Sequence, residues 1–253
     1  MNSSKIVITH IQKEPGNKEK DLQSRIKLPL IHRSQLSASV ADGWLYYSRH
    51  ALTFQIASKT GVGPLSVSFK NLEKRARDSL FNQNLIKALG FAKGDRPKVL
   101  DGTAGFGSDS FLIAYAGSKV SLFERNPIVY ELLQDGLTRY ASIGAKESLI
   151  VQRMGLYQKD FKKINRNEWS PEVVYLDPMF PGLGKKALSK KPMYYLQKLL
   201  TENNDESCMF ETALRIATKR VVVKRGAHTP ELTKGKVDFV YRGNSNRFDV
   251  YLV

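Results

Sequence analysis

The stretch Lys98–Gly107, with the sequence KVLDGTAGFG, decides the fold of this 253-residue chain. Its first half is apolar and ends in Asp101, as a buried strand does, and its second half holds Gly102, Gly105 and Gly107. Glycine lets the backbone turn sharply and approach a ligand closely. The residues that follow are typical of a helix, and ligands of open α/β sheets bind where strands end in this way. The stretch predicts a nucleotide-type site, with an ordinary strand-to-helix turn as the alternative.

Two familiar phosphate-binding loops do not fit these glycines. The dehydrogenase fingerprint is G-x-G-x-x-G, whereas the sequence from Gly105 onward is G-F-G-S-D-S and lacks the third glycine. The pattern G-x-x-x-x-G-K-[ST] occurs nowhere, and GLGKKA at 182–187 is only superficially similar. The ligand of this loop is therefore of another kind.

Outward from this stretch, strands and helices alternate from residue 67 to the end of the chain. Several strands are apolar throughout, which is typical of a doubly wound parallel sheet with helices on both faces. We predict strands at 98–101, 119–125, 148–153, 172–178, 219–225, 236–242 and 247–253, the last two as an antiparallel pair. We predict helices at 71–90, 108–117, 127–144, 190–200 and 208–218.

The first part of the chain has a different pattern. We predict a short strand at 5–10, a helix at 18–26 and a hairpin formed by 44–48 and 52–57. Glycine and proline at 61–64 separate this part from the alternating pattern. The sequence therefore predicts two domains, a small α+β region at 1–66 and a larger α/β domain at 67–253.

The net charge indicates a polyanionic partner. The chain has 40 Lys and Arg against 24 Asp and Glu, which gives a formal net charge of +16. Such an excess attracts nucleic acid first, with a generic solubility charge as the alternative. The single cysteine, Cys208, cannot form an intramolecular disulfide, and no apolar run is long enough for a transmembrane helix or a signal peptide. We therefore expect a cytoplasmic protein that binds nucleic acid.

An acid, Glu124, closes the strand that follows the glycine loop. A carboxylate in this place accepts hydrogen bonds from both hydroxyls of a ribose. This arrangement suits an adenosine-bearing cofactor that has no phosphate group. The alternative is a solvated acid at the end of a strand, paired with the neighbouring Arg125.

The stretch Val173–Pro181, VVYLDPMFP, ends another apolar strand in an acid, a proline and an aromatic ring. Asp-Pro-Met-Phe resembles the [Asp/Asn/Ser]-Pro-Pro-[aromatic] signature of amino-group methyltransferases that use S-adenosylmethionine (SAM). A nucleobase amine is a weak nucleophile, and acceptors on Asp177 and the Pro178 carbonyl would orient its lone pair. Phe180 offers a face on which a flipped base stacks. The alternative is a proline turn with a buried phenylalanine.

Longer blocks resemble the RsmJ family of bacterial methyltransferases over roughly residues 67–253. They are DGTAGFGSDSFLIA at 101–114, LFERNPIVYELLQDGLTR at 122–139, VVYLDPMFP and KKALSKK at 173–181 and 185–191, and ATKRVVVKR at 217–225. This family modifies the exocyclic N2 of one guanine in small-subunit (16S) ribosomal RNA. The resemblance implies SAM as cofactor, this RNA as substrate, and a Rossmann-like class I methyltransferase fold with a mostly parallel seven-stranded sheet.

The resemblance also implies site residues. The family loop carries an Arg-Asp pair where this chain has Ser108-Asp109, and the family's Ser-Ser pair on the third strand corresponds here to Met154-Gly155, where backbone contacts would replace hydroxyls. The expected cofactor-binding residues are Asp101, Gly102, Gly105, Gly107, Ser108, Asp109, Glu124, Arg125, Met154, Gly155 and Asp177. The expected catalytic residues are Asp177, Pro178 and Phe180.

Basic residues gather close to the expected amine site. Lys185, Lys186, Lys190 and Lys191 follow Asp177 within a short stretch of chain. Lysines that contact phosphates position a nucleic acid without reading its sequence. We therefore predict that these four residues bind RNA, with a solvated surface as the alternative.

Two other functions remain open from the sequence. One is an amino-methyltransferase that acts on DNA or on a protein amide, which the same site would serve. The other is a non-catalytic RNA-binding or ribosome assembly factor that has kept the fold. The four histidines are scattered, and with one cysteine there is no zinc pattern. The oligomeric state, the role of residues 1–66 and the assembly state of the RNA substrate are also open.

Overall fold

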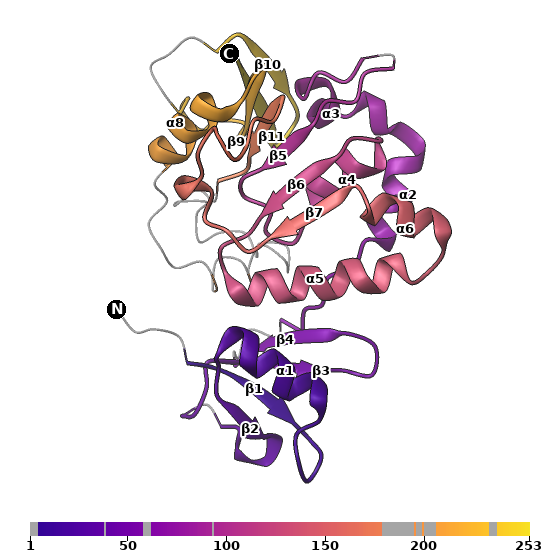
Figure 1. Cartoon of the computed structure of the whole chain (residues 1–253), viewed down its shortest axis with the longest axis vertical. Coiled ribbons are helices and arrows are strands. Elements are labelled where there is room, and N and C mark those ends of the chain that lie inside the picture. The colour runs from indigo at the N-terminus through magenta and orange to yellow at the C-terminus, as the bar shows by residue number, and fades with distance from the viewer. Residues whose placement is uncertain are drawn as a thin grey trace.

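The described residues of the chain form two β-sheets. The computed structural model describes residues 5–37, 39–57, 62–92, 94–178, 195, 199, 206–232 and 237–253. One sheet has four strands and the other has seven. Figure 1 shows the smaller sheet at one end of the molecule and the larger sheet at the other, with the long helix α5 (Pro127–Ala141) between them.

The smaller sheet is built from the first part of the chain. Its strands lie in the order β2-β1-β3-β4, and β3 and β4 form the predicted antiparallel hairpin. The short strand β2 was not predicted, since a three-residue strand carries almost no periodic signal. The proposed division at residues 66 and 67 falls in the segment between the two sheets and stays a prediction. The elements are β1 (Ile6–His10), α1 (Asn17–Ile26), β2 (Leu30–His32), η1 (Arg33–Gln35), β3 (Gly43–Tyr47) and β4 (Leu52–Ile56).

The larger sheet has the predicted mostly parallel arrangement. Its order is β10-β11-β9-β8-β5-β6-β7. The first of these strands along the chain, β5, therefore lies inside the sheet, and later strands lie on both sides of it. Strands β5 to β9 are parallel, and β11 is antiparallel to both of its neighbours. The strands are β5 (Val99–Asp101), β6 (Val120–Phe123), β7 (Met154–Tyr157), β8 (Val173–Leu176), β9 (Arg220–Gly226), β10 (Phe239–Arg242) and β11 (Asn246–Leu252).

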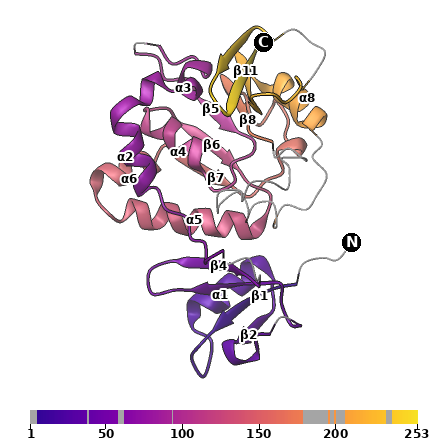
Figure 2. The same cartoon turned by 180° about the vertical axis from the view of Figure 1, so that it is seen from behind.

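Helices cover both faces of this sheet. A hydrophobic core lies on each face of the sheet. Successive side chains of a strand point to opposite faces, so that Val99 packs in one core and Leu100 in the other. In both views α8 lies on one side of the sheet, and α2 and α4 lie on the other (Figure 1 and Figure 2). None of the described helices is long and apolar enough to cross a bilayer. The remaining elements are α2 (Lys70–Ser79), η2 (Leu80–Asn82), α3 (Asn84–Ala88), α4 (Ser108–Tyr115), α6 (Ala145–Val151), η3 (Phe161–Lys163) and α8 (Glu206–Ile216).

The strand predicted at 148–153 is wrong. Residues Ala145–Val151 form the helix α6, and the strand β7 begins only at Met154. A short apolar run does not distinguish a buried strand from one face of a helix. The apolar run is not buried throughout as the predicted strand required, because Ile150 is buried while Leu149 is 54% exposed. The end of the third parallel strand therefore moves from Arg153 to Tyr157, which changes one expected part of the site.

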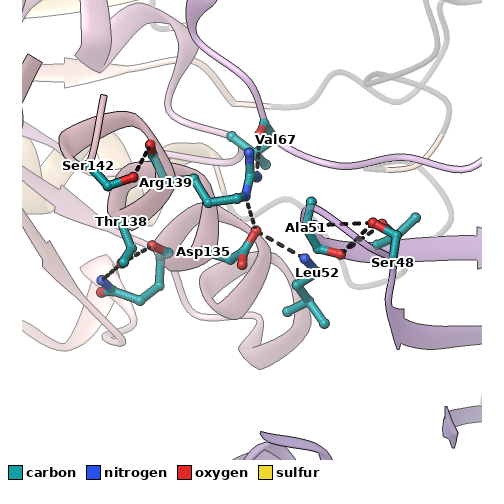
Figure 3. A network of polar contacts seen from close by, with 10 residues as sticks. Ser48, Ala51, Leu52, Val67, Asp135, Thr138, Arg139 and Ser142 are labelled. Carbon is teal, nitrogen blue, oxygen red and sulfur yellow. Dashed lines mark hydrogen bonds and ion pairs between the residues drawn. The ribbon is translucent and has the colours of Figure 1, made fainter. Parts of the chain in front are cut away.

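The smaller sheet is joined to α5 by polar contacts that Figure 3 shows. The carboxylate of Asp135 accepts hydrogen bonds from the backbone N–H of Leu52 in β4 at 3.1 Å and from Arg139 at 2.7 Å. Arg139 in turn donates to the carbonyl of Val67 at 2.7 Å. An ion pair between Arg25 of α1 and Glu131 of α5 adds a second connection at 2.8 Å. The helix thus holds the smaller sheet, the connecting segment and the larger sheet together.

Candidate active site

The candidate site lies where the parallel strands end. Because β5, β6, β7, β8 and β9 run in the same direction, their carboxyl ends meet along one side of the sheet. We call this side the carboxyl end of the sheet. The residues that the strands bring there include four of the sequence-predicted positions and two that were not predicted. They are Asp101 at the end of β5, Glu124 and Arg125 after β6, Tyr157 of β7, Asp177 after β8 and Lys224 near the end of β9.

The glycine loop between β5 and α4 is tied to both neighbouring strands. The backbone N–H of Gly102 donates to the carbonyl of Tyr175 at 3.0 Å, and that of Ala104 donates to the carbonyl of Phe123 at 3.1 Å. At the start of the loop, the buried carboxylate of Asp101 accepts from the Thr103 N–H at 3.0 Å and from the Ser110 hydroxyl at 2.5 Å. The loop is therefore preorganised by backbone contacts, with Asp101 as its internal support.

Asp101 makes the fold sensitive to pH. Burial is the largest influence and raises the pKa of Asp101 to about 7, although its two hydrogen bonds oppose the shift. In the unfolded chain this carboxyl ionises near pH 4, so the folded state loses stability as pH rises from about 4 to about 7.

The variant Asp101→Asn removes this penalty. We expect its free energy of unfolding, relative to the wild type, to rise on the order of 4 kcal/mol between about pH 4 and about pH 8. Urea unfolding of both proteins without cofactor measures the difference. The exposed Asp95→Asn variant is the control, and a difference for Asp101→Asn that does not change with pH contradicts the assignment.

Two glycines of the loop have backbone angles that favour glycine. Gly105 and Gly107 have φ values of 54° and 72°, and Gly107 immediately precedes α4. A Cβ atom on Gly107 would lie 2.8 Å from Cδ1 of Leu133 in α5. The loop therefore approaches α5 too closely for a side chain at this position.

We expect Gly107→Ala to destabilise the protein more than Gly94→Ala does. Gly94 also has a positive φ, of 84°, but a Cβ there would meet nothing within 4 Å. The control carries only the backbone cost of about 1–2 kcal/mol, and Gly107→Ala adds the clash with Leu133, about 1–3 kcal/mol more. Thermal unfolding measures both variants, and equal losses of stability would show that the contact with α5 carries no cost.

Glu124 is oriented by the loop itself. Its carboxylate accepts from the backbone N–H of Gly105 at 3.1 Å and from that of Asn126 at 2.7 Å. Each oxygen keeps a second lone pair for another donor. Glu124 is only 5% exposed, so it is not the solvated acid of the alternative interpretation. Burial is the largest influence and raises its pKa to about 7, while the two N–H donors oppose the shift.

Asp177 takes part in a polar cluster that the sequence did not predict. Its Oδ2 accepts from Nζ of Lys224 at 2.8 Å, and the same Nζ donates to Oδ2 of Asp109 at 2.7 Å. Tyr175 donates from its hydroxyl to Asp109 at 2.6 Å. The backbone N–H of Asp177 donates to Oγ1 of Thr103, at 2.7 Å, so the cluster also contacts the glycine loop.

The other predicted positions lie as follows. Ser108 is the exposed first residue of α4, Arg125 is half-buried beside Glu124, and Pro178 is buried behind Asp177. Phe180 and the four lysines predicted to bind RNA, Lys185, Lys186, Lys190 and Lys191, lie outside the described residues. Among the described residues, no group of three His, Cys, Asp or Glu side chains is arranged as metal ligands.

The expected cofactor contact at Met154-Gly155 is wrong. The register pairs Met154 with Val120 and Tyr157 with Phe123, so Met154 and Gly155 belong to the start of β7. At about 3.3 Å per residue, the start of this strand is roughly 10 Å from the end that adjoins Glu124. The residues that β7 brings to the carboxyl end are Tyr157 and the turn after it, where Asp160 accepts from the N–H of Lys162 at 3.1 Å. The misplaced strand at 148–153 is the cause of this error.

The described residues fit a nucleoside cofactor without phosphates. The loop offers close backbone approach, and Glu124 offers a buried acceptor with lone pairs to spare at the place where a ribose binds in sheets of this kind. Within the loop, no lysine or arginine is present that would hold a pyrophosphate. Next to it, Asp177 offers a hydrogen-bond acceptor for a second molecule.

Comparisons with known proteins agree with this geometry. The model of the family described as "Putative SAM-dependent methyltransferase" matches residues 27–253, so the family extends into the smaller sheet and beyond the resemblance seen at 67–253. A protein of Dechloromonas aromatica named ribosomal RNA small subunit methyltransferase J is 40% identical, over 85% of this chain and 89% of its own length. A protein of the same name from Thioalkalivibrio sulfidiphilus is 34% identical over 100% of this chain and 99% of its own.

A solved structure shares the whole architecture. The SAM-dependent methyltransferase of Neisseria gonorrhoeae is 28% identical, with a TM-score of 0.73 over 98% of this chain and 95% of that one. The seven-stranded sheet is therefore the Rossmann-like sheet of SAM-dependent methyltransferases, and S-adenosylmethionine is the cofactor that the glycine loop and Glu124 fit. The chain belongs to the RsmJ family of SAM-dependent methyltransferases.

Proposed function

We propose that this protein transfers a methyl group from SAM to the exocyclic N2 amine of a guanine in 16S ribosomal RNA. The hydrogen bonding of the Asp177 carboxylate is the observation that supports this proposal most. Its Oδ2 is held by Lys224, and its Oδ1 has no hydrogen-bond partner among the described residues. An acceptor fixed beside the cofactor loop, with one oxygen that no described residue contacts, suits an amine that has N–H groups to donate.

The cofactor residues of the proposal are those that the carboxyl end of the sheet provides. SAM supplies an electrophilic methyl group bound to a positively charged sulfur. Gly102, Gly105 and Gly107 allow its close approach, and Glu124 accepts from the ribose hydroxyls. We keep Asp101, Ser108, Asp109 and Arg125 as the loop and strand-end residues around them. The turn after β7, with Asp160, replaces Met154-Gly155 in the proposed set.

The substrate amine is oriented rather than strongly activated. Its nitrogen lone pair is delocalised into the base, and acceptors on Asp177 and the Pro178 carbonyl would turn that lone pair toward the methyl group. The negative charge of Asp177 also stabilises the positive charge that develops on nitrogen. Once alkylated the nitrogen is acidic, and it loses its proton to the carboxylate or to water. Catalysis is then mostly positioning.

The remaining parts of the proposal rest on the sequence. We propose that Phe180 stacks on the flipped guanine and that Lys185, Lys186, Lys190 and Lys191 contact its phosphates. The net charge of +16 supports a nucleic-acid substrate. The names of the relatives, which refer to small-subunit ribosomal RNA, support this particular RNA. With such a substrate we propose a cytoplasmic location.

The test uses SAM with a tritiated methyl group. We expect the purified protein to label 16S ribosomal RNA, as free RNA or in small subunits from cells that lack the gene, and to leave DNA and ribosomal proteins unlabelled. Subunits from wild-type cells are the control, because their site is already methylated. Label in DNA or in protein would favour the alternative amino-methyltransferases, and no label in any substrate would favour a binding factor.

A further inference from the structure

Lys224 lies between two carboxylates at the proposed amine site. Its Nζ is 2.7 Å from Oδ2 of Asp109 and 2.8 Å from Oδ2 of Asp177. Only 22% of the Lys224 side chain is exposed, and the carboxylates are 22% and 33% exposed. This is not an ordinary surface ion pair, since one ammonium group joins the start of α4 to the ends of β8 and β9.

Among the described residues, the charged and titratable groups around Asp177 come from four elements, β9, α4, β5 and β8. Lys224 comes from β9 and is the only cationic group that contacts Asp177 among the described residues. Asp109 comes from α4, Asp101 comes from β5, and the buried Tyr175 precedes it in β8. Of these groups, Asp109 and Asp177 contact the lysine directly. Burial raises the pKa of Asp177 overall, and Lys224 is the group that opposes this shift.

We propose that Lys224 is a positioning residue that keeps Asp177 ionised and fixes its Oδ2, so that Oδ1 faces the substrate amine. The proposal rests on the proposed function of Asp177. In this proposal Lys224 contacts neither the cofactor nor the substrate and acts only through Asp177. The proposal also explains why a lysine follows the three valines Val221–Val223 where β9 reaches the site.

The electrostatics support the proposal. Burial is the largest influence on Asp177 and raises its pKa; Asp109 raises it further, and Lys224 is the main group that lowers it. Burial by itself lowers the pKa of Lys224, but Asp109 and Asp177 outweigh this, and the pKa is raised overall. Without Lys224, the negative charge of Asp109 would favour the protonated form of Asp177 with no cation to oppose it. A protonated Asp177 would lose the negative charge that stabilises the nitrogen.

The test is the pH dependence of single-turnover transfer at saturating SAM. We expect Lys224→Met to be about 30- to 100-fold slower than the wild type near pH 6 and to recover as pH rises, with its profile displaced toward alkaline pH by about 1.5 units or more. Lys224→Arg keeps the cation, so its profile should stay in place even if its rate falls. These variants separate the charge of Lys224 from its shape.

Removing the second carboxylate supplies the sharpest comparison. In Asp109→Asn/Lys224→Met the like charge beside Asp177 is absent, so we expect at least about tenfold recovery near pH 6 relative to Lys224→Met. The matched control is Lys219→Met, which removes an exposed lysine paired with Glu172 at the opposite end of β9, and its profile should equal that of the wild type. If Lys224→Met does not fold, Asp109→Asn alone should displace the profile toward acid pH.

The outcomes separate this inference from the proposed function. A wild type that labels RNA, with a Lys224→Met profile that is unchanged in position, overturns the role of Lys224 and leaves the function intact. If Lys224→Met is unfolded, an Asp109→Asn variant whose pH profile is not displaced overturns the role of Lys224 equally. Failure of the wild type to methylate 16S ribosomal RNA overturns the function itself.

Discussion

The variant Asp177→Ala is expected to lose methyl transfer almost completely while still binding SAM. The side chain supplies both an acceptor for the amine and a negative charge beside it, and losing such a group typically costs about 10²–10⁴-fold in rate. The fold should survive, because Lys224 keeps Asp109 as a partner at 2.7 Å when Asp177 is removed. Single-turnover transfer and calorimetric titration with SAM measure the two properties separately.

Asp177→Asn is the matched control for that result. Asparagine keeps one acceptor oxygen and loses the charge, so its rate should lie between those of the wild type and Asp177→Ala. Normal turnover by Asp177→Ala would contradict the role of Asp177. Loss of SAM binding together with loss of transfer would mean that this carboxylate belongs to the cofactor site instead.

The variant Glu124→Ala is expected to weaken the binding of SAM by about 100-fold or more. Two hydrogen bonds to a charged acceptor contribute about 1.5–3 kcal/mol each, and the alanine also leaves the N–H groups of Gly105 and Asn126 without their acceptor. Glu124→Gln keeps the shape and should lose less. Calorimetric titration with SAM is the measurement, and equal affinity of wild type and Glu124→Ala would remove this residue from the cofactor site.

The raised pKa of Glu124 gives the same experiment a pH dependence. Its pKa is about 7 in the folded protein, so the carboxylate takes up a proton as pH falls through that value. A protonated carboxyl is the weaker acceptor, and the affinity of the wild type for SAM should fall from about pH 8 to about pH 6. Glu124→Gln cannot ionise and should show a smaller change over the same range.

Much of the fold was visible in the sequence because its signals are local. The residue types at 98–117 are enough to predict a strand, a glycine loop and a helix. The apolar runs around Val174 and Val222 are short and rich in β-branched residues, which favours strands over helices. The order of strand-end residues Asp101, Glu124 and Asp177 then follows from the fold. The error at 148–153 arose where three apolar residues, Leu149, Ile150 and Val151, carry no periodic signal, and it displaced one pair of site residues.

The contacts of Asp177 could not be predicted in the same way. Lys224 lies 115 positions from Asp109 and 47 positions from Asp177 along the chain, and no spacing rule connects them. Only the placement of β9 beside β8 brings them together. The one available signal was a lysine directly after three buried valines, which the sequence alone presents as a basic residue near a strand end.

The central claim is that the acceptor at Asp177 presents the N2 amine of guanine. The most direct test is mass spectrometry of the nucleosides released from 16S ribosomal RNA after reaction with the wild type and with Asp177→Ala. The account predicts N2-methylguanosine with the wild type and none above background with the variant. Methylation of another base, or of a ring nitrogen or a ribose, would contradict it.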